Sequence, residues 1–358
     1  MPAFFSGRKV LLLSLMPCFC TILLYAQVNP YPSKEQVAAD FKRMLSRPVV
    51  DFRPDFKSVT TDSAIIERGT IYSEENEKIP ILIYKPVSAG LRSYPAVIFL
   101  HGTGGTKDSA EIKNVLYQLC KRGIMGIAID ARYHGTRIPG GAHGSKEYVA
   151  AVTKAWENKD ETKQTHPFYY DTVFDLWRLA DYLVTRPDVE ADRIGMGGIS
   201  MGGIETWMAA SADLRIKVVV LDIAAQSFKW SLENDRWQGR AGTIHAAHLQ
   251  AARDMGDPTL NKRNVKALWD KLIPGITGEF DCPSMIRLIA PRYLLILSTE
   301  NDQNCPLPGA KIAYESAAAA YSELGARDNV KMDIAPNLRH QTTPQHLQMT
   351  LDWFSKWL

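Results

Sequence analysis

The sequence has little cysteine, which limits the part that disulfides can play. Five cysteines occur in 358 residues. Cys18 and Cys20 lie in an N-terminal apolar segment, so three remain in the rest of the chain: Cys120, Cys282 and Cys305. An odd number excludes a complete disulfide framework. A bridge between Cys282 and Cys305 and a set of buried free thiols both fit the sequence.

The sequence also has little excess of charge of either sign, with 42 Lys and Arg residues against 39 Asp and Glu residues. The formal net charge is +3 at pH 7 and falls to +1 when segment 1–26, with two positive and no negative residues, is left out. So small a charge gives no electrostatic footprint for nucleic acid. There is also no internal repeat and no low-complexity linker. The apolar content of 46% and the charged content of 23% are ordinary for a globular domain with a sizeable core.

A strongly apolar run stands at the N-terminus. Arg8 and Lys9 precede the run 10–25, and the small residue Ala26 follows it. This pattern is typical of a secretory signal peptide, here cleaved after Ala26. The run is short for the roughly 20 residues of a spanning helix. We therefore expect a secreted or periplasmic protein without stable membrane insertion; a lipoprotein acylated at Cys18 or Cys20 is the weaker alternative.

The rest of the chain predicts an N-terminal arm at 27–60, with one helix at 34–45, and a single domain at 61–358. Two alternating runs, 64–72 and 78–84, indicate an antiparallel hairpin. Short apolar strands then alternate with amphipathic helices, which is typical of a doubly wound, mostly parallel α/β sheet. The strands expected are 96–100, 124–129, 194–198, 218–223, 293–297 and 330–334, and the helices lie around 112–119 and at 171–185, 201–210, 309–324 and 344–358.

Two segments, 135–169 and 226–289, break this alternation. Both follow strand ends, where functional residues usually lie. We expect the second to be a mostly helical cap over the site, although a packed subdomain without substrate contact fits the sequence too. Its tryptophans, Trp230, Trp237 and Trp269, suit sugar stacking and core packing equally well.

The motif Gly-x-Ser-x-Gly occurs at 198–202, between an apolar strand and a helical pattern. A nucleophile elbow requires this context, because the tight turn exposes the serine hydroxyl at a helix N-terminus. Side chains at Gly198 and Gly202 would collide in such a turn, and Gly203 would let the helix approach the sheet. Ser200 is therefore the predicted nucleophile.

A serine nucleophile needs a base and a carboxylate that orients the base. With this elbow the chain order is serine, acid, histidine. Asp302 follows the strand 293–297 and is the expected acid, while Glu300 is the close competitor and Asp222 the more distant one.

His340, between the last strand and the last helix, is the expected base. His346 falls inside that helix and is expected to be a surface or packing residue. His245 and His248 lie in the proposed cap, where two histidines without further ligands do not indicate a metal site.

The oxyanion of a tetrahedral intermediate needs two backbone donors. The amide of Met201, directly after the nucleophile, is expected to be one. The other is expected in the Gly-rich run 101–105, which follows the strand 96–100; Thr103 is favoured and Gly104 is the alternative.

These motifs resemble the α/β-hydrolase superfamily, and most of all its dienelactone-hydrolase-like, acetyl-xylan-esterase-like and prolyl-oligopeptidase-like branches. The resemblance covers about 60–358 and rests on the segments 101–105, 130–135, 192–195 and 198–203 together with Asp302 and His340. In these branches a segment like Asp130-x-Arg132-x-His134 supports the wall of the site.

Some features depart from particular branches. Carbohydrate esterases of the cephalosporin-deacetylase kind carry Arg-Gly-Gln after an early strand and His-Glu at the base, whereas Gln341 follows His340 here. Dienelactone hydrolases use cysteine as the nucleophile.

The resemblance implies a secreted serine carboxylic ester hydrolase that forms an acyl-enzyme and needs no cofactor and no metal. Small-molecule or carbohydrate esters, such as acyl groups on plant polysaccharides, are the expected substrates. A prolyl-oligopeptidase-type serine peptidase is the alternative. Those enzymes usually carry a large N-terminal propeller, whereas only about 60 residues precede the hydrolase region here. A non-catalytic binding protein on the same scaffold is the third reading.

Overall fold

The computed structural model describes residues 1–3, 31–87, 93–141 and 145–358. Its elements of secondary structure all belong to the unit Tyr31–Leu358. The predicted signal peptide, with its cleavage site at Ala26, lies outside the described residues except for 1–3. Within the described ranges, no helix is both long enough and apolar enough to cross a membrane.

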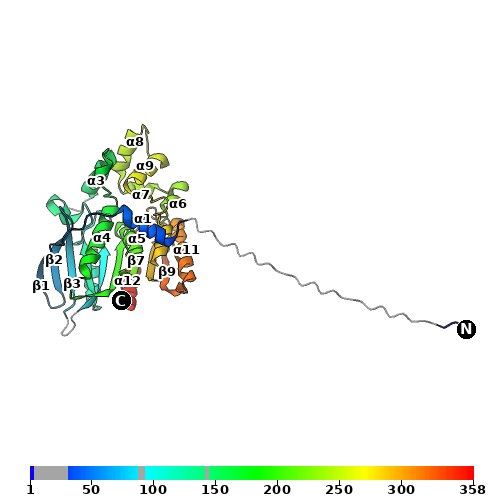
Figure 1. The fold of residues 1–358 in the computed structure, drawn as a ribbon, viewed down its shortest axis with the longest axis horizontal. Helices are drawn as coiled ribbons and strands as arrows, with labels where there is room; N and C mark the ends of the chain where they lie inside the picture. Colours follow the sequence, from blue (N-terminus) through cyan, green and yellow to red (C-terminus); the bar gives the residue numbers. More distant parts are fainter. Residues whose placement is uncertain (4–30, 88–92, 142–144) are drawn as a thin grey trace. The chain divides into compact units, whose positions relative to one another are not determined.

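One nine-stranded sheet runs through the described part of this unit (Figure 1), in the order β1-β2-β3-β5-β4-β6-β7-β8-β9. The pairs from β1 to β5 are antiparallel, and all pairs from β5 to β9 are parallel. The strands are β1 (Asp55–Thr60), β2 (Ile65–Glu74), β3 (Glu77–Lys85), β4 (Tyr94–Leu100), β5 (Met125–Ile129), β6 (Val189–Ile199), β7 (Ile216–Asp222), β8 (Tyr293–Thr299) and β9 (Val330–Ala335).

The predicted α/β class, the hairpin and the six later strands are confirmed. The expectation that 27–60 would contain one helix and otherwise irregular chain was wrong at its end, because 55–60 forms β1 on the edge of the sheet. Five of its six residues are exposed. Its sequence therefore lacks the alternation of apolar and polar residues that a half-buried strand shows.

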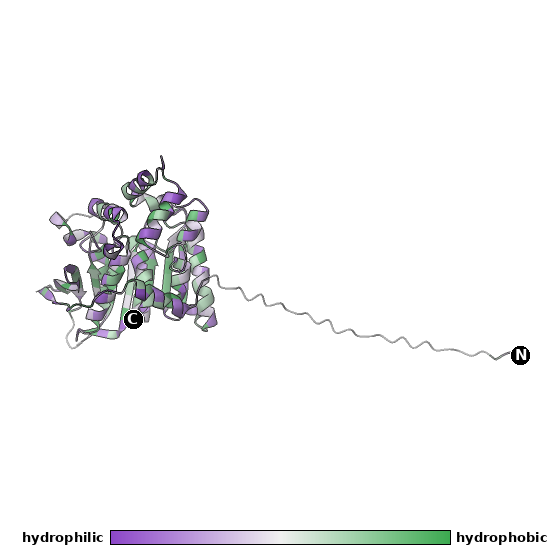
Figure 2. Ribbon diagram, turned by 45° about the horizontal axis from the view of Figure 1, so that its top comes forward, coloured by the Kyte–Doolittle hydropathy of each residue, from purple (hydrophilic) through white to green (hydrophobic). Residues whose placement is uncertain are grey.

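Helices cover both faces of the sheet, and the sheet is apolar on both. In β4, Ala96, Ile98 and Leu100 belong to one core and Val97 and Phe99 to the other, since successive strand residues point to opposite faces. Figure 2 shows hydrophobic residues on the central strands. The first core includes α1 (Lys34–Met44), α4 (Tyr170–Leu183), α5 (Met201–Ala212), α10 (Cys282–Ile286) and α11 (Leu307–Glu323), and the second includes α2 (Ala110–Cys120) and α12 (Pro344–Trp357).

The segment 226–289 is helical, as predicted. Figure 1 shows α7, α8 and α9 together with α3 at the top of the view, above the sheet, so α3 from the segment 135–169 joins this group. The helices are α3 (Ser145–Glu157), α6 (Phe228–Glu233), α7 (Gln238–Gly242), α8 (His245–Asp254) and α9 (Lys262–Leu272). Short 3-10 turns complete the chain at η1 (Gly135–Arg137), η2 (Pro139–Gly141), η3 (Glu161–Lys163), η4 (Arg287–Ile289) and η5 (Arg327–Asn329).

A buried ion pair fixes the loop after β5 against α4. Arg132 donates from Nε and Nη2 to the two carboxylate oxygens of Asp175, each at 2.8 Å. Arg137 adds a contact of 2.7 Å to the same carboxylate, which is fully buried. Burial alone would raise the pKa of Asp175, yet the two guanidinium groups hold it below its usual value.

We expect Asp175→Asn to lower the free energy of unfolding by about 3–5 kcal/mol, because it removes the carboxylate that pairs with buried Arg137 and one of the carboxylates that pair with buried Arg132, which still contacts Glu74. Chemical denaturation at neutral pH measures this loss. Asp270→Asn is the matched control: Asp270 pairs with Lys266 on the exposed face of α9 at 2.5 Å, and its removal should cost no more than about 0.5 kcal/mol. Equal effects of the two variants would contradict the role given to the buried pair.

Candidate active site

Ser200 lies on a sharp turn between β6 and α5. Its φ of 52° and ψ of −112° are unusual for a residue with a side chain, and such strain persists only where the surroundings hold it. Here the Ser200 amide donates to the carbonyl of Asp222 at 2.9 Å, and its carbonyl accepts from the amide of Ile204 at 2.9 Å. The turn is therefore fastened to β7 on one side and to α5 on the other.

Glycines allow the close approach of α5 to the sheet. A Cβ on Gly198 would lie 2.5 Å from the carbonyl carbon of Gly202. A Cβ on Gly203 would lie 2.4 Å from the Cβ of Ala224. The predicted clash is thus present at Gly198. The reason given for Gly202 needs correction, because a Cβ there would meet Leu100 at 2.5 Å instead of Gly198.

The structure brings Ser200, His340 and Asp302 into one hydrogen-bonded row. Ser200 Oγ lies 2.7 Å from His340 Nε2, and His340 Nδ1 lies 2.7 Å from Asp302 Oδ2. The three residues follow β6, β9 and β8, whose carboxyl ends meet at one edge of the parallel sheet. The Asp302 side chain is 1% exposed and that of His340 is 20% exposed. A buried carboxylate behind a partly exposed imidazole suits an acid that orients a base.

Asp302 is held by its own loop. Its second oxygen, Oδ1, accepts from the amides of Asn304 at 2.7 Å and Cys305 at 2.8 Å. One carboxylate oxygen is thus occupied by backbone donors, and the other is left to face His340.

The loops that carry Asp302 and His340 are hydrogen-bonded to each other. Thr299 Oγ1 donates to the carbonyl of Arg339 at 2.7 Å, and the amide of Asn301 donates to the carbonyl of Leu338 at 2.8 Å. Glu300 takes part as well, because its Oε2 accepts from the amide of Asn337 at 2.7 Å. Its carboxylate therefore supports the histidine loop rather than the imidazole.

The other candidates lie in different surroundings. The carboxylate of Asp222 is 3.3 Å from Nδ1 of His346. His346 lies in the first turn of α12 and is fully buried, so of the two expected roles, surface or packing, its position agrees with packing. His248 is buried beside Trp269, whereas His245 is exposed.

The Gly-rich loop after β4 is held by two buried histidines. His101 Nε2 accepts from the amide of Ala131 at 3.1 Å, so the proton sits on Nδ1 and is donated to the carbonyl of Gly102 at 2.8 Å. His134 repeats this arrangement: Nε2 accepts from the amide of Gly104 at 3.2 Å, and Nδ1 faces the carbonyl of Arg132 at 2.8 Å. Both rings are thus neutral acceptors.

These hydrogen bonds distinguish the two candidate oxyanion donors of the loop, the amides of Thr103 and Gly104. The Gly104 amide is engaged by His134, whereas the amides of Thr103 and Met201 have no acceptor in the described part of the chain. A Cβ built on Gly102 would lie 3.6 Å from the Cβ of Ser200, so the loop lies next to Ser200. His134 is a supporting residue whose partner could not be identified from sequence spacing.

The segment 130–137 supports this wall from behind. Asp130 is fully buried and accepts from the Lys107 amide at 2.9 Å, from Lys107 Nζ at 2.6 Å and from the Thr136 amide at 2.9 Å. Burial alone would raise the pKa of Asp130, but Lys107 holds it below the usual value. The supporting position expected for Asp130, Arg132 and His134 agrees with these contacts.

Cys120, Cys282 and Cys305 are all buried and free, so the bridge between Cys282 and Cys305 is not formed. Cys305 Sγ contacts Arg240 Nη2 at 2.9 Å and the carbonyl of Ile223 at 3.2 Å. Burial raises the pKa of the Cys305 thiol to about 12.

Ligand atoms of Asp302, Cys305 and His340 lie within 4.8 Å of one another. Each is already engaged by protein partners, and the guanidinium of Arg240 touches the thiol. These surroundings suit a neutral Cys305 thiol beside the Asp302 carboxylate better than a bound cation.

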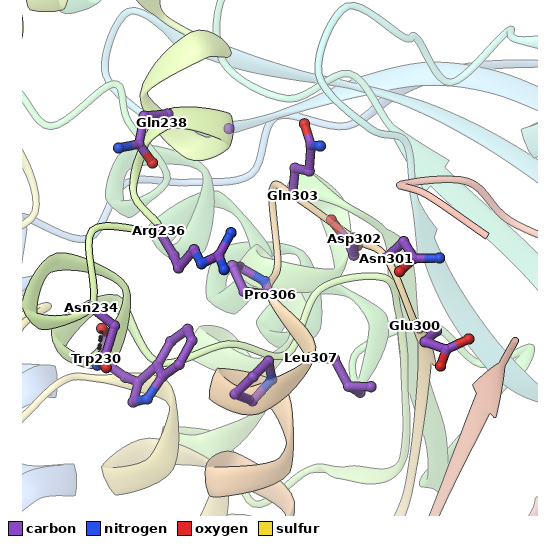
Figure 3. Close-up of a pocket in the computed structure, with 12 residues that line it drawn as sticks. Trp230, Asn234, Arg236, Gln238, Glu300, Asn301, Asp302, Gln303, Pro306 and Leu307 are labelled. Atoms are coloured by element: carbon purple, nitrogen blue, oxygen red, sulfur yellow. Dashed lines mark hydrogen bonds between the residues drawn. The ribbon is translucent and has the colours of Figure 1, made fainter. Parts of the chain in front are cut away.

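A cavity of about 610 Å³ opens beside Asp302 (Figure 3). The segment that links α6 to α7 forms one wall, and the loop after β8 forms the other. The sequence pointed to Trp230 as a member of the cap, but it did not indicate Arg236 or Gln238, because nothing in their spacing pairs them with residues 300–308.

The chain was compared with known families. The model of the acetyl xylan esterase (AXE1) family matches residues 22–227, which is more than half of the chain. The chain belongs to the acetyl xylan esterase family. The matched range includes Ser200 and the Gly-rich loop, while Asp302 and His340 follow it. Gln341 after His340 and the missing Arg-Gly-Gln therefore do not exclude membership of this family.

A curated relative and two solved structures agree with this assignment. The hydrolase YtaP of Bacillus subtilis (strain 168) is 26% identical over 311 residues, which cover 81% of this chain and 90% of that protein. Acetyl xylan esterase 1 from Thermoanaerobacterium sp. JW/SL YS485 has a TM-score of 0.61 at 18% identity, covering 92% and 95% of the two chains. The acetyl xylan esterase from Paenibacillus sp. R4 has a TM-score of 0.63 at 19% identity, covering 92% and 98%.

At these identities the two structures establish the shared α/β-hydrolase fold. The family makes this esterase a serine carboxylic ester hydrolase. The comparisons do not favour the peptidase alternative, and the reading as a non-catalytic binding protein is set aside.

The neutral state of His134 has a consequence for stability at low pH. Burial, with a smaller contribution from the neighbouring His101, lowers the pKa of His134 to about 4. An unfolded histidine titrates near 6.5. Between these values the unfolded chain binds more protons than the folded one, so His134 costs stability as the pH falls from about 6.5 to 4.

We expect wild-type protein to lose roughly 3 kcal/mol more than His134→Gln over this range, given a difference of about 2.5 pKa units. Denaturation at a series of pH values measures the difference, and a glutamine oxygen can still accept from the Gly104 amide. His245→Gln, at an exposed histidine of α8, should follow the wild-type curve. If His134→Gln did so too, His134 would not be held neutral.

Proposed function

We propose that the protein is a secreted serine esterase that removes short acyl groups, acetyl above all, from carbohydrate esters by way of Ser200, His340 and Asp302. The observation that carries the proposal is the row of 2.7 Å contacts from Ser200 Oγ through His340 to Asp302 in a chain of the acetyl xylan esterase family.

In the first step Ser200 Oγ attacks the ester carbonyl carbon, and its proton passes to His340 Nε2. Asp302 Oδ2 accepts from Nδ1–H and stabilises the imidazolium that forms. The carbon–oxygen bond to the alcohol then breaks, and His340 returns the proton to the leaving oxygen. The product of this half-reaction is an acyl-enzyme at Ser200.

The amides of Met201 and Thr103 donate to the oxyanion of the tetrahedral intermediate. Met201 begins α5, so the helix dipole favours negative charge at this point. Thr103 is preferred to Gly104 because the Gly104 amide already donates to His134. Water activated by His340 then attacks the acyl carbon and releases the acid from Ser200.

Two further features support the substrate class and the location. The relatives of the same fold include two named acetyl xylan esterases. The N-terminal sequence, with Arg8 and Lys9 before an apolar run and Ala26 after it, is that of an exported protein. Such a protein meets polysaccharide esters outside the cell. We expect faster hydrolysis of p-nitrophenyl acetate than of its octanoate homologue and release of acetate from acetylated xylan.

Ser200→Ala should lower kcat for p-nitrophenyl acetate by about 10⁴-fold or more, since the attacking oxygen is lost. It should also abolish labelling of the folded protein by a fluorophosphonate. Ser211→Ala is the matched control, because Ser211 is a buried serine of α5, the helix that directly follows Ser200. Persistent labelling of Ser200→Ala, or equal loss in both variants, would refute the assignment of the nucleophile.

Asp302→Asn should lower kcat by about 10³- to 10⁴-fold, because an amide does not hold His340 in the required tautomer. Glu300→Gln should reduce kcat less than tenfold, since Glu300 bonds the Asn337 amide and not the imidazole. Steady-state kinetics at pH 8, with thermal unfolding to check folding, compare the two. A larger loss in Glu300→Gln would transfer the role of acid to Glu300.

A further inference from the structure

The cavity beside Asp302 is lined by a group of side chains suited to a polyhydroxylated ligand. Polar groups line both walls: Asn234, Arg236 and Gln238 from the cap, and Glu300, Asn301 and Gln303 from the loop after β8. Its volume of about 610 Å³ falls within the range of small-molecule sites.

Several of these polar groups have no protein partner. Among the described residues, the side chains of Gln238, Asn301 and Gln303 make no hydrogen bond, whereas Asn234 Nδ2 donates to the carbonyl of Trp230 at 2.9 Å. An amide offers both a donor and an acceptor, which is what a sugar hydroxyl requires. These amides stand on both walls, with Gln238 on the cap and Asn301 and Gln303 on the loop after β8 (Figure 3).

Trp230 adds an aromatic surface. It is half-buried, and its atom Cε3 lies 3.6 Å from the position of a Cβ on Gly309, so the indole packs against the start of α11 while it lines the cavity. An indole has an apolar face and a polar N–H group. Such a surface suits the apolar face of a pyranose ring.

Arg236 is the one cationic side chain among the residues that line the cavity, which also include the carboxylates of Glu300 and Asp302. Its amide donates to the carbonyl of Ser231 at 2.7 Å, which fixes the backbone directly after α6. Its guanidinium reaches between the walls near Pro306 (Figure 3) and makes no ion pair in the described part of the chain. Glu300 stands on the opposite wall and already accepts from Asn337. A bound carboxylate would therefore lie on the cap side, where Arg236 can contact it with two parallel hydrogen bonds.

We propose that this cavity, with Trp230 and Arg236 as its main contacts, is a saccharide subsite that prefers a sugar bearing a carboxylate, a uronic acid. The proposal rests on the proposed function, since the saccharide is the alcohol part of the ester. Asp302 belongs both to the cavity lining and to the row that leads to Ser200. Ser200 and His340 do not line the cavity, so the sugar bound here would be a neighbour of the acylated sugar and not the acylated sugar itself.

Binding is tested without catalysis. The full chain with Ser200→Ala is titrated calorimetrically with xylotriose that carries one glucuronic acid branch and, separately, with neutral xylotetraose. We expect at least tenfold tighter binding of the acidic sugar at low salt, and a smaller difference at 0.5 M NaCl because screening weakens the ion pair. Adding Arg236→Gln should remove the difference, and adding Trp230→Phe should weaken the binding of both sugars.

Arg253→Gln is the matched control, because Arg253 is an exposed arginine of the cap helix α8 that does not line the cavity. It should retain the preference. Equal affinity for the two sugars, or a preference that survives Arg236→Gln, would overturn the subsite.

Kinetics with active protein keep the two proposals apart. The ratio of kcat/KM for the acetylated acidic sugar to that for the acetylated neutral sugar should fall at least tenfold in Arg236→Gln and stay constant in Arg253→Gln. If wild-type protein hydrolyses p-nitrophenyl acetate through Ser200 but Arg236→Gln leaves this ratio unchanged, the subsite is wrong and the esterase proposal stands. If Ser200→Ala still binds the acidic sugar but loses no esterase activity, the proposed nucleophile is wrong and the subsite stands.

Discussion

The site depends on the close approach of α5 to the strands β6 and β7. Ser200 keeps a positive φ because its amide is bonded to β7 and its carbonyl to the first turn of α5. Those bonds exist only while the helix lies against the sheet, and a side chain at Gly198 or Gly203 would push it away. This contact between α5 and the sheet fixes the position of the Ser200 hydroxyl. It therefore also fixes the distance of the hydroxyl from His340 and from the Gly-rich loop.

The strand order explains why the other groups meet at the same place. The chain leaves β4 toward β5 on one side and returns through β6 on the other, so the edge between β4 and β6 is a topological switch point. The loop after β4 carries Thr103, and the turn after β6 carries Ser200. The next strands bring in Asp302 and His340 from loops that are bonded to each other. The parallel sheet thus brings together four segments that lie far apart in the sequence.

Much of this could be predicted from the sequence because each signal is local. An apolar strand followed by a glycine-flanked serine identifies the elbow, and the chain order favours Asp302 as the acid over Glu300 and Asp222 and His340 as the base. The choice between Asp302 and Glu300 depends on which carboxylate the loop turns inward, and that depends on the amides of Asn304 and Cys305. The strand β1 was missed because its edge position leaves most of its residues exposed. The bond from Gly104 to His134 joins loops 30 residues apart, and no spacing rule predicts it.

The cap and the acid loop are parts of one packed unit. A Cβ on Gly239 would lie 2.1 Å from the carbonyl oxygen of Gln303, and Arg240 contacts Cys305 at 2.9 Å. Cys305 in turn donates its amide to Asp302. The start of α7 therefore rests on the backbone that holds the carboxylate, and the cavity lies in the angle between them. The loop after β8 thus lines the cavity and also holds the Asp302 carboxylate through the amides of Asn304 and Cys305. Movement of α7 away from this loop would therefore disturb both the cavity wall and the backbone that holds the Asp302 carboxylate.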